Sequence, residues 1–194
     1  MNRAERAQNT TDALIAAALE VLGREGLKGT TTRAIAERAG VNEVTLFRKF
    51  GSKDGLVREA VSEVVTTFTQ ESVVHTGDLE ADLIRLITDY KTMLGRYGPV
   101  ARALLTEVPF DDRVAPSLEP LRAVLRAVAG LLSRYQDEGA LEREAPETQI
   151  PALLGPIAMP IVTGGLGLLP SDEPAPQFDP ATHVRRFLRG RAAG

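Results

Sequence analysis

Apolar residues recur at helical spacing along almost the whole chain, and this spacing limits the possible folds more than any other feature. The stretch TTDALIAAALEVLGREG over residues 10–26 is an example, with Thr10 and Thr11 as candidate N-caps and Gly26 as a left-handed stop. Its apolar positions are Leu14, Ile15, Ala18, Leu19 and Leu22. No run shows the sustained alternation, with a period of two residues, that indicates a half-buried strand. The sequence therefore predicts an all-α protein.

Three further stripes of apolar residues at helical spacing occur between residues 56 and 135. They are Leu56, Val57, Ala60, Val61, Val64 and Phe68; then Leu83, Leu86, Ile87, Tyr90, Leu94 and Tyr97; then Leu121, Leu125, Val128, Leu132 and Tyr135. Each stripe is long enough to bury one side of a helix several turns long. We expect these helices to pack together as a bundle.

Cysteine content and charge narrow the class of protein. The chain has 194 residues, no cysteine and a formal net charge of −3, so disulfides, thiolate metal sites and a cysteine nucleophile are excluded. Residues 1–54 hold nine Lys or Arg against seven Asp or Glu, whereas the remaining residues hold 14 against 19. The N-terminal stretch has no apolar core followed by a small-residue cleavage site, so we expect no signal peptide and a cytoplasmic location.

The segment 148–171 carries no charged residue, although it contains four prolines. Its length would allow it to cross a membrane, but flanking positive charge is missing. We favour a buried helix over a membrane span. Because little of the chain remains to cover a helix that is apolar on all sides, a second subunit is the expected cover.

Residues 31–53 form the pattern from which we infer function. Two short helices joined by AGVN at 39–42 are typical of a helix-turn-helix. Thr31 and Asn42 are the expected N-caps, and Gly40 the expected stop of the first helix. The expected inward residues are Ile35, Ala36 and Ala39 on the first helix and Leu46 and Phe50 on the second.

The second of these helices would then turn polar and apolar groups outward. Its outward residues are Glu43, Val44, Thr45, Phe47, Arg48 and Lys49, and we expect all of them except Glu43 to contact DNA. In such motifs the second helix enters the major groove of DNA, where Thr45 or Val44 could contact thymine and Arg48 could bind guanine or phosphate. Lys53 follows Ser52, the expected cap of the next helix, and is a candidate phosphate contact.

The same residues resemble the signature of the TetR family of transcriptional regulators over 27–56. The shared elements are the Thr-rich start, the Ile-Ala pair, AGV, TLF, Phe50 and SK before an apolar helix. The resemblance implies an all-helical homodimer that binds a near-palindromic duplex operator, most often as a repressor, with no cofactor. It also implies a DNA-binding domain at 1–55, and a domain at 56–194 for dimerisation and for a small effector that releases DNA.

By position, the resemblance assigns the DNA contacts to the two short helices and to the helix that follows. They are Thr31, Thr32, Arg33, Val44, Thr45, Phe47, Arg48 and Lys53. Phe47 departs from the family's usual Tyr, so a phenol contact to phosphate is missing. Glu43 stands where a cation or small polar residue is common. We favour a solvated charge at the helix start over a contact with cytosine N4.

The C-terminal half offers candidates for the effector pocket and the dimer interface. The pocket candidates are Tyr90, Met93, Tyr97, Phe110 and Met159, although for each of them we favour ordinary core packing over contact with a ligand. The interface candidates are Leu153, Leu154, Ile157, Ile161, Val162 and Phe187. We expect a two-fold dimer to use this patch twice.

Two other classes of function remain as alternatives. An enzyme would need a catalytic or metal constellation, but His75 and His183 are far apart in sequence and no metal-ligand motif occurs. We therefore expect no catalytic residue and no metal site. A helical protein that binds a small ligand, but not DNA, is the second alternative.

Overall fold

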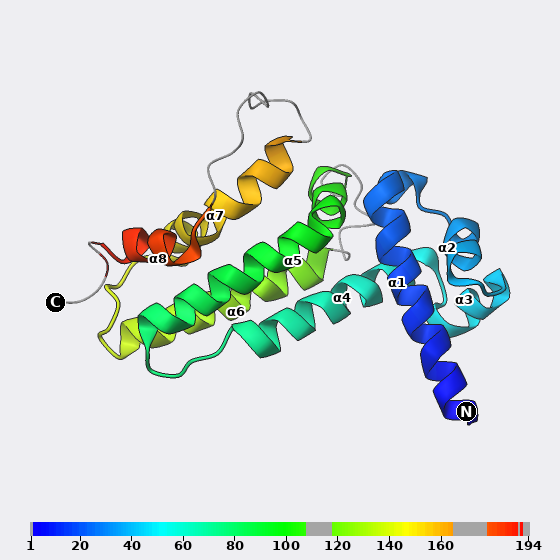
Figure 1. Cartoon of the computed structure of the whole chain (residues 1–194), viewed down its shortest axis with the longest axis horizontal. Coiled ribbons are helices and arrows are strands. Elements are labelled where there is room, and N and C mark those ends of the chain that lie inside the picture. The colour runs from blue at the N-terminus through cyan, green and yellow to red at the C-terminus, as the bar shows by residue number, and fades with distance from the viewer. Residues whose placement is uncertain (1, 108–117, 165–177, 190, 192–194) are drawn as a thin grey trace. The chain divides into compact units, whose positions relative to one another are not determined.

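The computed structural model describes residues 2–107, 118–164, 178–189 and 191, and these form helices with no β-strand. Figure 1 shows the eight helices in chain order. They are α1 (Arg3–Gly29), α2 (Thr32–Ala39), α3 (Glu43–Phe50), α4 (Lys53–Ser72), α5 (Leu79–Glu107), α6 (Glu119–Asp137), α7 (Pro146–Gly164) and α8 (Pro180–Leu188). The expected all-α class is confirmed.

The start of α1 differs from the expectation. Asn2, rather than Thr10 or Thr11, caps the helix: its side chain accepts from the Glu5 N–H at 2.9 Å, and the Glu5 carboxylate accepts from the Asn2 N–H at 2.7 Å. This reciprocal pair is a capping box. The two threonines lie inside the helix and donate their hydroxyls to the carbonyls one turn back, at 2.8 and 3.0 Å.

Gly26 breaks the helical path within Arg3–Gly29, as the sequence predicts, and α1 comprises a helical stretch on each side of it. The φ of Gly26 is 71°, so the N–H groups that follow need other acceptors. The Glu107 carboxylate supplies them, accepting from the N–H of Leu27 at 2.9 Å and of Lys28 at 3.0 Å. A Cβ at position 26 would lie 2.5 Å from Glu107 Oε1. The site therefore needs glycine for its φ, and a side chain there would also displace the Glu107 carboxylate from its hydrogen bonds.

By packing, the chain divides into two compact units. Unit 1 comprises Met1–Val65 and Tyr97–Pro120, and unit 2 comprises Thr66–Arg96 and Leu121–Gly194. The functional division into a DNA-binding domain at 1–55 and an effector and dimerisation domain at 56–194 stays a prediction. Within unit 1, α2 packs against α1 and α3. Their shared core consists of Leu14, Ile15, Ala17, Ala18, Val21, Ile35, Leu46, Leu56 and Ala60.

The expected stripes of α4 and α5 are largely buried, and on α6 Val128, Leu132 and Tyr135 are buried as expected. On α4, Val65 is buried and Val64 only partly so. On α6, Val124 is 2% exposed and Leu125 is 41% exposed, so the expectation for Leu125 was wrong. Adjacent residues on a helix point about 100° apart, and packing against neighbouring helices buries Val124 rather than Leu125.

The charge-free segment forms α7, which is described to Gly164; residues 165–171 lie outside the described part. The prolines at 151, 156 and 160 are all exposed, and a proline removes one backbone hydrogen bond from a helix. Among the described residues, no helix is both long and apolar enough to span a bilayer.

The buried side of α7 is covered by the chain itself. Leu153, Leu154 and Ile157 are at most 8% exposed, and α8 packs on α7 with Phe187 4% exposed. His183 Nε2 lies 2.8 Å from the Leu153 carbonyl oxygen. The expected cover by a second subunit was therefore wrong for these four apolar residues. The amphipathic helix α8 (Pro180–Leu188) belongs to the same chain and covers this side of α7.

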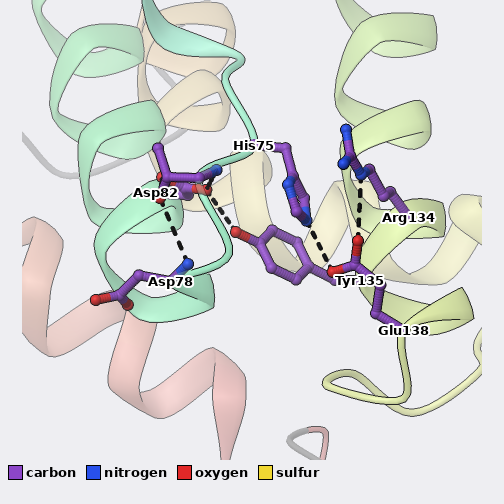
Figure 2. Close-up of polar contacts among 7 residues, drawn as sticks. His75, Asp78, Asp82, Arg134, Tyr135 and Glu138 are labelled. Carbon is purple, nitrogen blue, oxygen red and sulfur yellow. Dashed lines mark hydrogen bonds and ion pairs between the residues drawn. The ribbon is translucent and has the colours of Figure 1, made fainter.

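A buried polar cluster joins the start of α5 to the end of α6 in unit 2 (Figure 2). Asp82 is fully buried and accepts from the Thr76 N–H at 2.6 Å, the Thr76 hydroxyl at 2.8 Å, Arg85 at 2.7 Å and the Tyr135 hydroxyl. Burial alone would raise the pKa of Asp82, but the hydrogen bonds from Tyr135 and Thr76 outweigh it and hold that pKa below its usual value. Burial, together with Asp82, raises the pKa of Tyr135 to about 12.

Candidate nucleic-acid interface

The ends of α2 and α3 are set by local side-chain and glycine chemistry, as the sequence predicts. Thr31 Oγ1 accepts from the Ala34 N–H at 3.1 Å, and Asn42 Oδ1 accepts from the Val44 N–H at 2.9 Å. Gly40 has a left-handed φ of 68° and closes α2. Gly40 and Asn42 thus define a compact turn between two eight-residue helices, which is helix-turn-helix geometry.

The inward side of α3 is anchored in the core of unit 1. Leu46 is fully buried among residues of α1, α2 and α4, and Phe50 is partly buried against the same cluster. Both expectations are confirmed. This anchoring fixes which residues of the short helix can face outward.

The outward side of α3 combines apolar and cationic groups. Val44 is 72% exposed, Phe47 is 48% exposed and Arg48 is also exposed, while Thr45 is partly buried. Large exposed apolar residues are informative because a soluble domain normally buries them. Groups of these kinds contact base edges and phosphates in the major groove.

Residues of α2 flank this surface. Thr31 and Arg33 are exposed, and Arg33 Nε donates to Glu37 Oε1 at 2.8 Å. The hydrogen bond and charge of Glu37 raise the pKa of Arg33, and Glu43 adds to the effect. Such a solvent-exposed pair is weak, so a phosphate can compete for the guanidinium.

Two of the expected DNA-contacting lysines are engaged within unit 1. Lys49 is partly buried, and its ammonium donates to the Ala7 carbonyl at 2.9 Å and the Thr11 hydroxyl at 2.7 Å. The Lys53 ammonium donates to the Leu27 carbonyl at 3.1 Å. We expected Lys49 to point outward with Arg48, but its long side chain reaches α1 instead. Its contact with DNA, like that of Lys53, is therefore not indicated by this geometry.

The expectation of a solvated Glu43 was wrong. Glu43 is partly buried, and its carboxylate accepts a hydrogen bond from the hydroxyl of Thr32. Thr32 is the first residue of α2 and Glu43 the first of α3, so the contact joins the starts of the two helices. The sequence places each residue at a helix start, but gives no sign that these starts lie close together.

The candidates for an effector pocket stay predictions. Tyr90 is 9% exposed, Met93 is partly buried, and Met159 is 56% exposed, all in unit 2. Tyr97 is partly buried and belongs to unit 1, and Phe110 lies outside the described residues. The ring of Tyr90 lies 6.0 Å from that of Phe68, and burial raises the pKa of Tyr90 to about 12. Tyr90 is thus a core residue of unit 2 in this structure.

The remaining interface candidates are on α7. Ile161 is partly buried, and the side chain of Val162 lies outside the described part. His75 Nε2 lies 2.8 Å from Glu138 Oε2, and the His75 ring lies 4.5 Å from the ring of Tyr135 at a tilt of 33°. In the described ranges, no three His, Asp or Glu residues are grouped so that they could hold a metal ion.

Comparisons with known proteins agree with this geometry. The family model described as bacterial regulatory proteins of the tetR family matches residues 14–60, which contain α2, α3 and the core that supports them. YvkB of Bacillus subtilis, a protein named as an HTH-type transcriptional regulator, is 37% identical over 79 residues, which are 41% of this chain. The match spans 42% of the length of YvkB.

Two longer matches extend the likeness to the second half of the chain. The regulator FadR from Bacillus subtilis, solved in complex with stearoyl-CoA, shares the fold with a TM-score of 0.69 and 18% identity, over 91% of this chain and 95% of that chain. The DNA-binding transcriptional repressor TetR of Mycobacteroides abscessus is 33% identical over 139 residues, covering 64% of this chain and 70% of that protein. The chain therefore belongs to the TetR family of bacterial regulatory proteins and is a DNA-binding transcriptional regulator.

Proposed function

We propose that this chain is a cytoplasmic repressor that binds a near-palindromic operator as a homodimer and releases it when a small apolar or amphipathic effector binds. The observation that carries the proposal is the two-sided character of α3. Leu46 is fully buried, whereas Val44 is largely exposed and Phe47 about half exposed beside the exposed Arg48. An exposed helix side of this composition, fixed in orientation by its buried side, supports entry into the major groove.

The proposed DNA contacts on α3 and at the start of α2 are of two kinds. Val44, Thr45 and Phe47 carry apolar groups or a hydroxyl that can contact base edges, including the thymine methyl group. Thr31 and Arg33 lie at the start of α2 and are proposed to bind phosphate, which positions the protein without selecting a sequence. Arg48 could act in either way, because guanidinium binds guanine and phosphate equally well in geometry.

Selection of duplexes from a random library, followed by fluorescence-anisotropy titration at several salt concentrations, tests the proposal. We expect the wild-type chain to enrich an inverted repeat whose half-sites lie one helical turn apart, as a two-fold dimer requires. The selected duplex should be bound more tightly than a shuffled duplex at every salt concentration. A helical ligand-binding protein without DNA function would enrich no sequence, and that result would contradict the proposal.

Replacing Arg48 with Ala separates its two possible roles. If Arg48 contacts a base, the change should weaken binding to the selected duplex by about 1–3 kcal/mol and relax the sequence preference at one base pair. If it contacts phosphate, affinity should fall equally for all sequences and the salt dependence should become shallower by about one counterion. Arg134→Ala, an exposed arginine of unit 2, is the matched control. Unchanged affinity for both duplexes in Arg48→Ala would remove Arg48 from the interface.

The exposed side of α7, distinct from its buried side, is the proposed dimer contact. Pro156, Met159 and Pro160 are exposed, with Met159 56% open to solvent, whereas Leu153 is already covered. Exposed apolar residues on one helix side support self-association, since two copies can bury the same patch. The inverted repeat expected from the selection experiment would require this assembly.

The effector proposal is supported by the apolar core of unit 2 and by the likeness to FadR. Tyr90, Phe68 and Leu94 are buried in α4 and α5, and FadR was solved with stearoyl-CoA in a similar fold. We expect a panel of fatty acids and acyl-CoAs, with stearoyl-CoA as the first probe, to include a compound that raises the thermal midpoint. That compound should also weaken operator binding by the same coupling factor with which the operator weakens compound binding. Thermal stabilisation with unchanged operator affinity would contradict release by the effector.

A further inference from the structure

The carboxylate of Glu43 lies where the first turns of α2 and α3 meet. Thr32 donates its hydroxyl to this carboxylate, and both residues are partly buried. Asn42 caps α3 directly before Glu43, and Thr31 caps α2 directly before Thr32. The acidic group is thus held in place rather than free to sample solvent.

This position matters because the same end of α3 is offered to DNA. The first turn of a helix has N–H groups without internal acceptors and a partial positive charge, so it favours anions. A DNA phosphate is one such anion, and the bound carboxylate of Glu43 is another. Like charges at one place repel, so a phosphate approaching this edge meets a fixed negative charge.

The charge of Glu43 also acts on a neighbouring cation. Glu37 raises the pKa of Arg33 through a hydrogen bond and its charge, and Glu43 adds to that rise. The negative charges of Glu37 and Glu43 therefore partly offset the positive charge of the Arg33 guanidinium, which is proposed to bind phosphate. Both effects lower the attraction of α2 and α3 for the DNA backbone, which is the part of the duplex that is the same in every sequence.

Resting on the DNA-binding function proposed above, we propose that Glu43 is a specificity-determining residue. Its carboxylate, positioned by Thr32, weakens contacts with phosphate at the start of α2 and α3. Binding then depends more strongly on contacts between base edges and Val44, Thr45 and Phe47. Glu43 thus increases the ratio of specific to non-specific affinity by lowering the non-specific affinity more.

Glu43→Gln tests this inference because glutamine keeps the size and the oxygen that accepts from Thr32 while removing the charge. The probes are a duplex selected with the wild-type chain and a shuffled duplex of the same composition. We expect affinity for the shuffled duplex to rise about three- to tenfold, with a steeper salt dependence, and affinity for the selected duplex to rise less. The specificity ratio should fall. Glu142→Gln, an exposed residue of unit 2, makes the same change in net charge and should leave the ratio unchanged.

Thr32→Val tests the positioning role separately. Valine preserves the shape of threonine but cannot donate to Glu43. The effect of Glu43→Gln on the specificity ratio should be smaller in the Thr32→Val background, because the carboxylate is no longer held there. Equal effects in both backgrounds would overturn the role of Thr32.

Three results would overturn the role of Glu43. Unchanged affinity of Glu43→Gln for the shuffled duplex would show that its charge does not reach the backbone. Weaker binding to both duplexes, with a lowered thermal midpoint, would show a structural role only. Weaker binding to the selected duplex alone, with changed preference at one base pair, would show base readout by the carboxylate. If the wild-type chain enriches no duplex at all, the proposed DNA-binding function fails before this comparison begins.

Discussion

Asp82→Ala should lower the free energy of unfolding by about 3–5 kcal/mol, because it removes a fully buried carboxylate that is the acceptor of several hydrogen bonds. The Tyr135 hydroxyl, the Thr76 hydroxyl and the Thr76 N–H would lose their shared acceptor, and Arg85 its carboxylate. Figure 2 shows the tyrosine hydroxyl directed at this carboxylate from α6. Chemical denaturation followed by circular dichroism measures the change.

Two variants separate the cluster from general effects of substitution. Tyr135→Phe removes one hydroxyl and leaves the carboxylate with its other donors, so it should cost less, about 1–3 kcal/mol. Asp137→Ala removes an exposed carboxylate that pairs with Arg143, and its stability should stay close to that of the wild type. Equal stability of Asp82→Ala and Asp137→Ala would contradict a structural role for the cluster.

Asp82 and Tyr135 also make the free energy of unfolding depend on pH. Because the pKa of Asp82 is lower in the folded chain than in the unfolded chain, the unfolded state binds its proton first as the pH falls. The contribution is therefore fully present above the ordinary aspartate pKa and is lost as the pH falls through the lower folded value. At the alkaline end, the raised pKa of Tyr135 removes stability as the pH rises from about 10 towards 12. Asp82→Asn should lack the acid-dependent part.

Leu46→Ala should have the second large effect, because Leu46 fixes α3 in the core of unit 1. Truncating a fully buried leucine costs about 2–5 kcal/mol, depending on how far the cavity collapses. Loss of this anchor should also weaken binding to the selected duplex, since the outward side of α3 is oriented by its inward side. Denaturation curves and anisotropy titrations measure the two effects.

Val44→Ala is the matched comparison on the same helix. Val44 is 72% exposed, so its truncation should change stability by no more than about 0.5 kcal/mol. If Val44 contacts a thymine methyl group, the variant should nevertheless lose affinity for the selected duplex and not for the shuffled one. Comparable losses of stability in Leu46→Ala and Val44→Ala would refute the assignment of the two sides of α3.

The helix-turn-helix could be predicted because its determinants are local. Thr31 and Asn42 cap helices through atoms two or three residues away, and Gly40 closes a helix through its own φ. The spacing of Leu46 and Phe50 then defines which side of α3 is buried. Local chemistry misled at one point, since Asn2 outcompetes Thr10 and Thr11 as the first N-cap.

The candidate site could be predicted only in part, because long side chains reach across elements. Lys49 was expected to face outward, but its ammonium finds acceptors on α1, 38 and 42 residues earlier in the chain. Lys53 reaches Leu27 in the same way, and Glu107 reaches the N–H groups after Gly26 from about 80 residues away. Partners so distant in sequence leave no periodic signal.

The sequence by itself determined the helical class, the caps of α2 and α3, and the placement of Leu46 on the buried side of α3 and of Val44 on its exposed side. These follow from 3.6-residue periodicity and from hydrogen bonds made within one or two turns. Only the tertiary structure decided that Glu43 is bound by Thr32, that Asp82 meets Tyr135, and that α8 covers α7. Those contacts depend on which surfaces the folded chain brings together, and burial then decides which polar groups must pair.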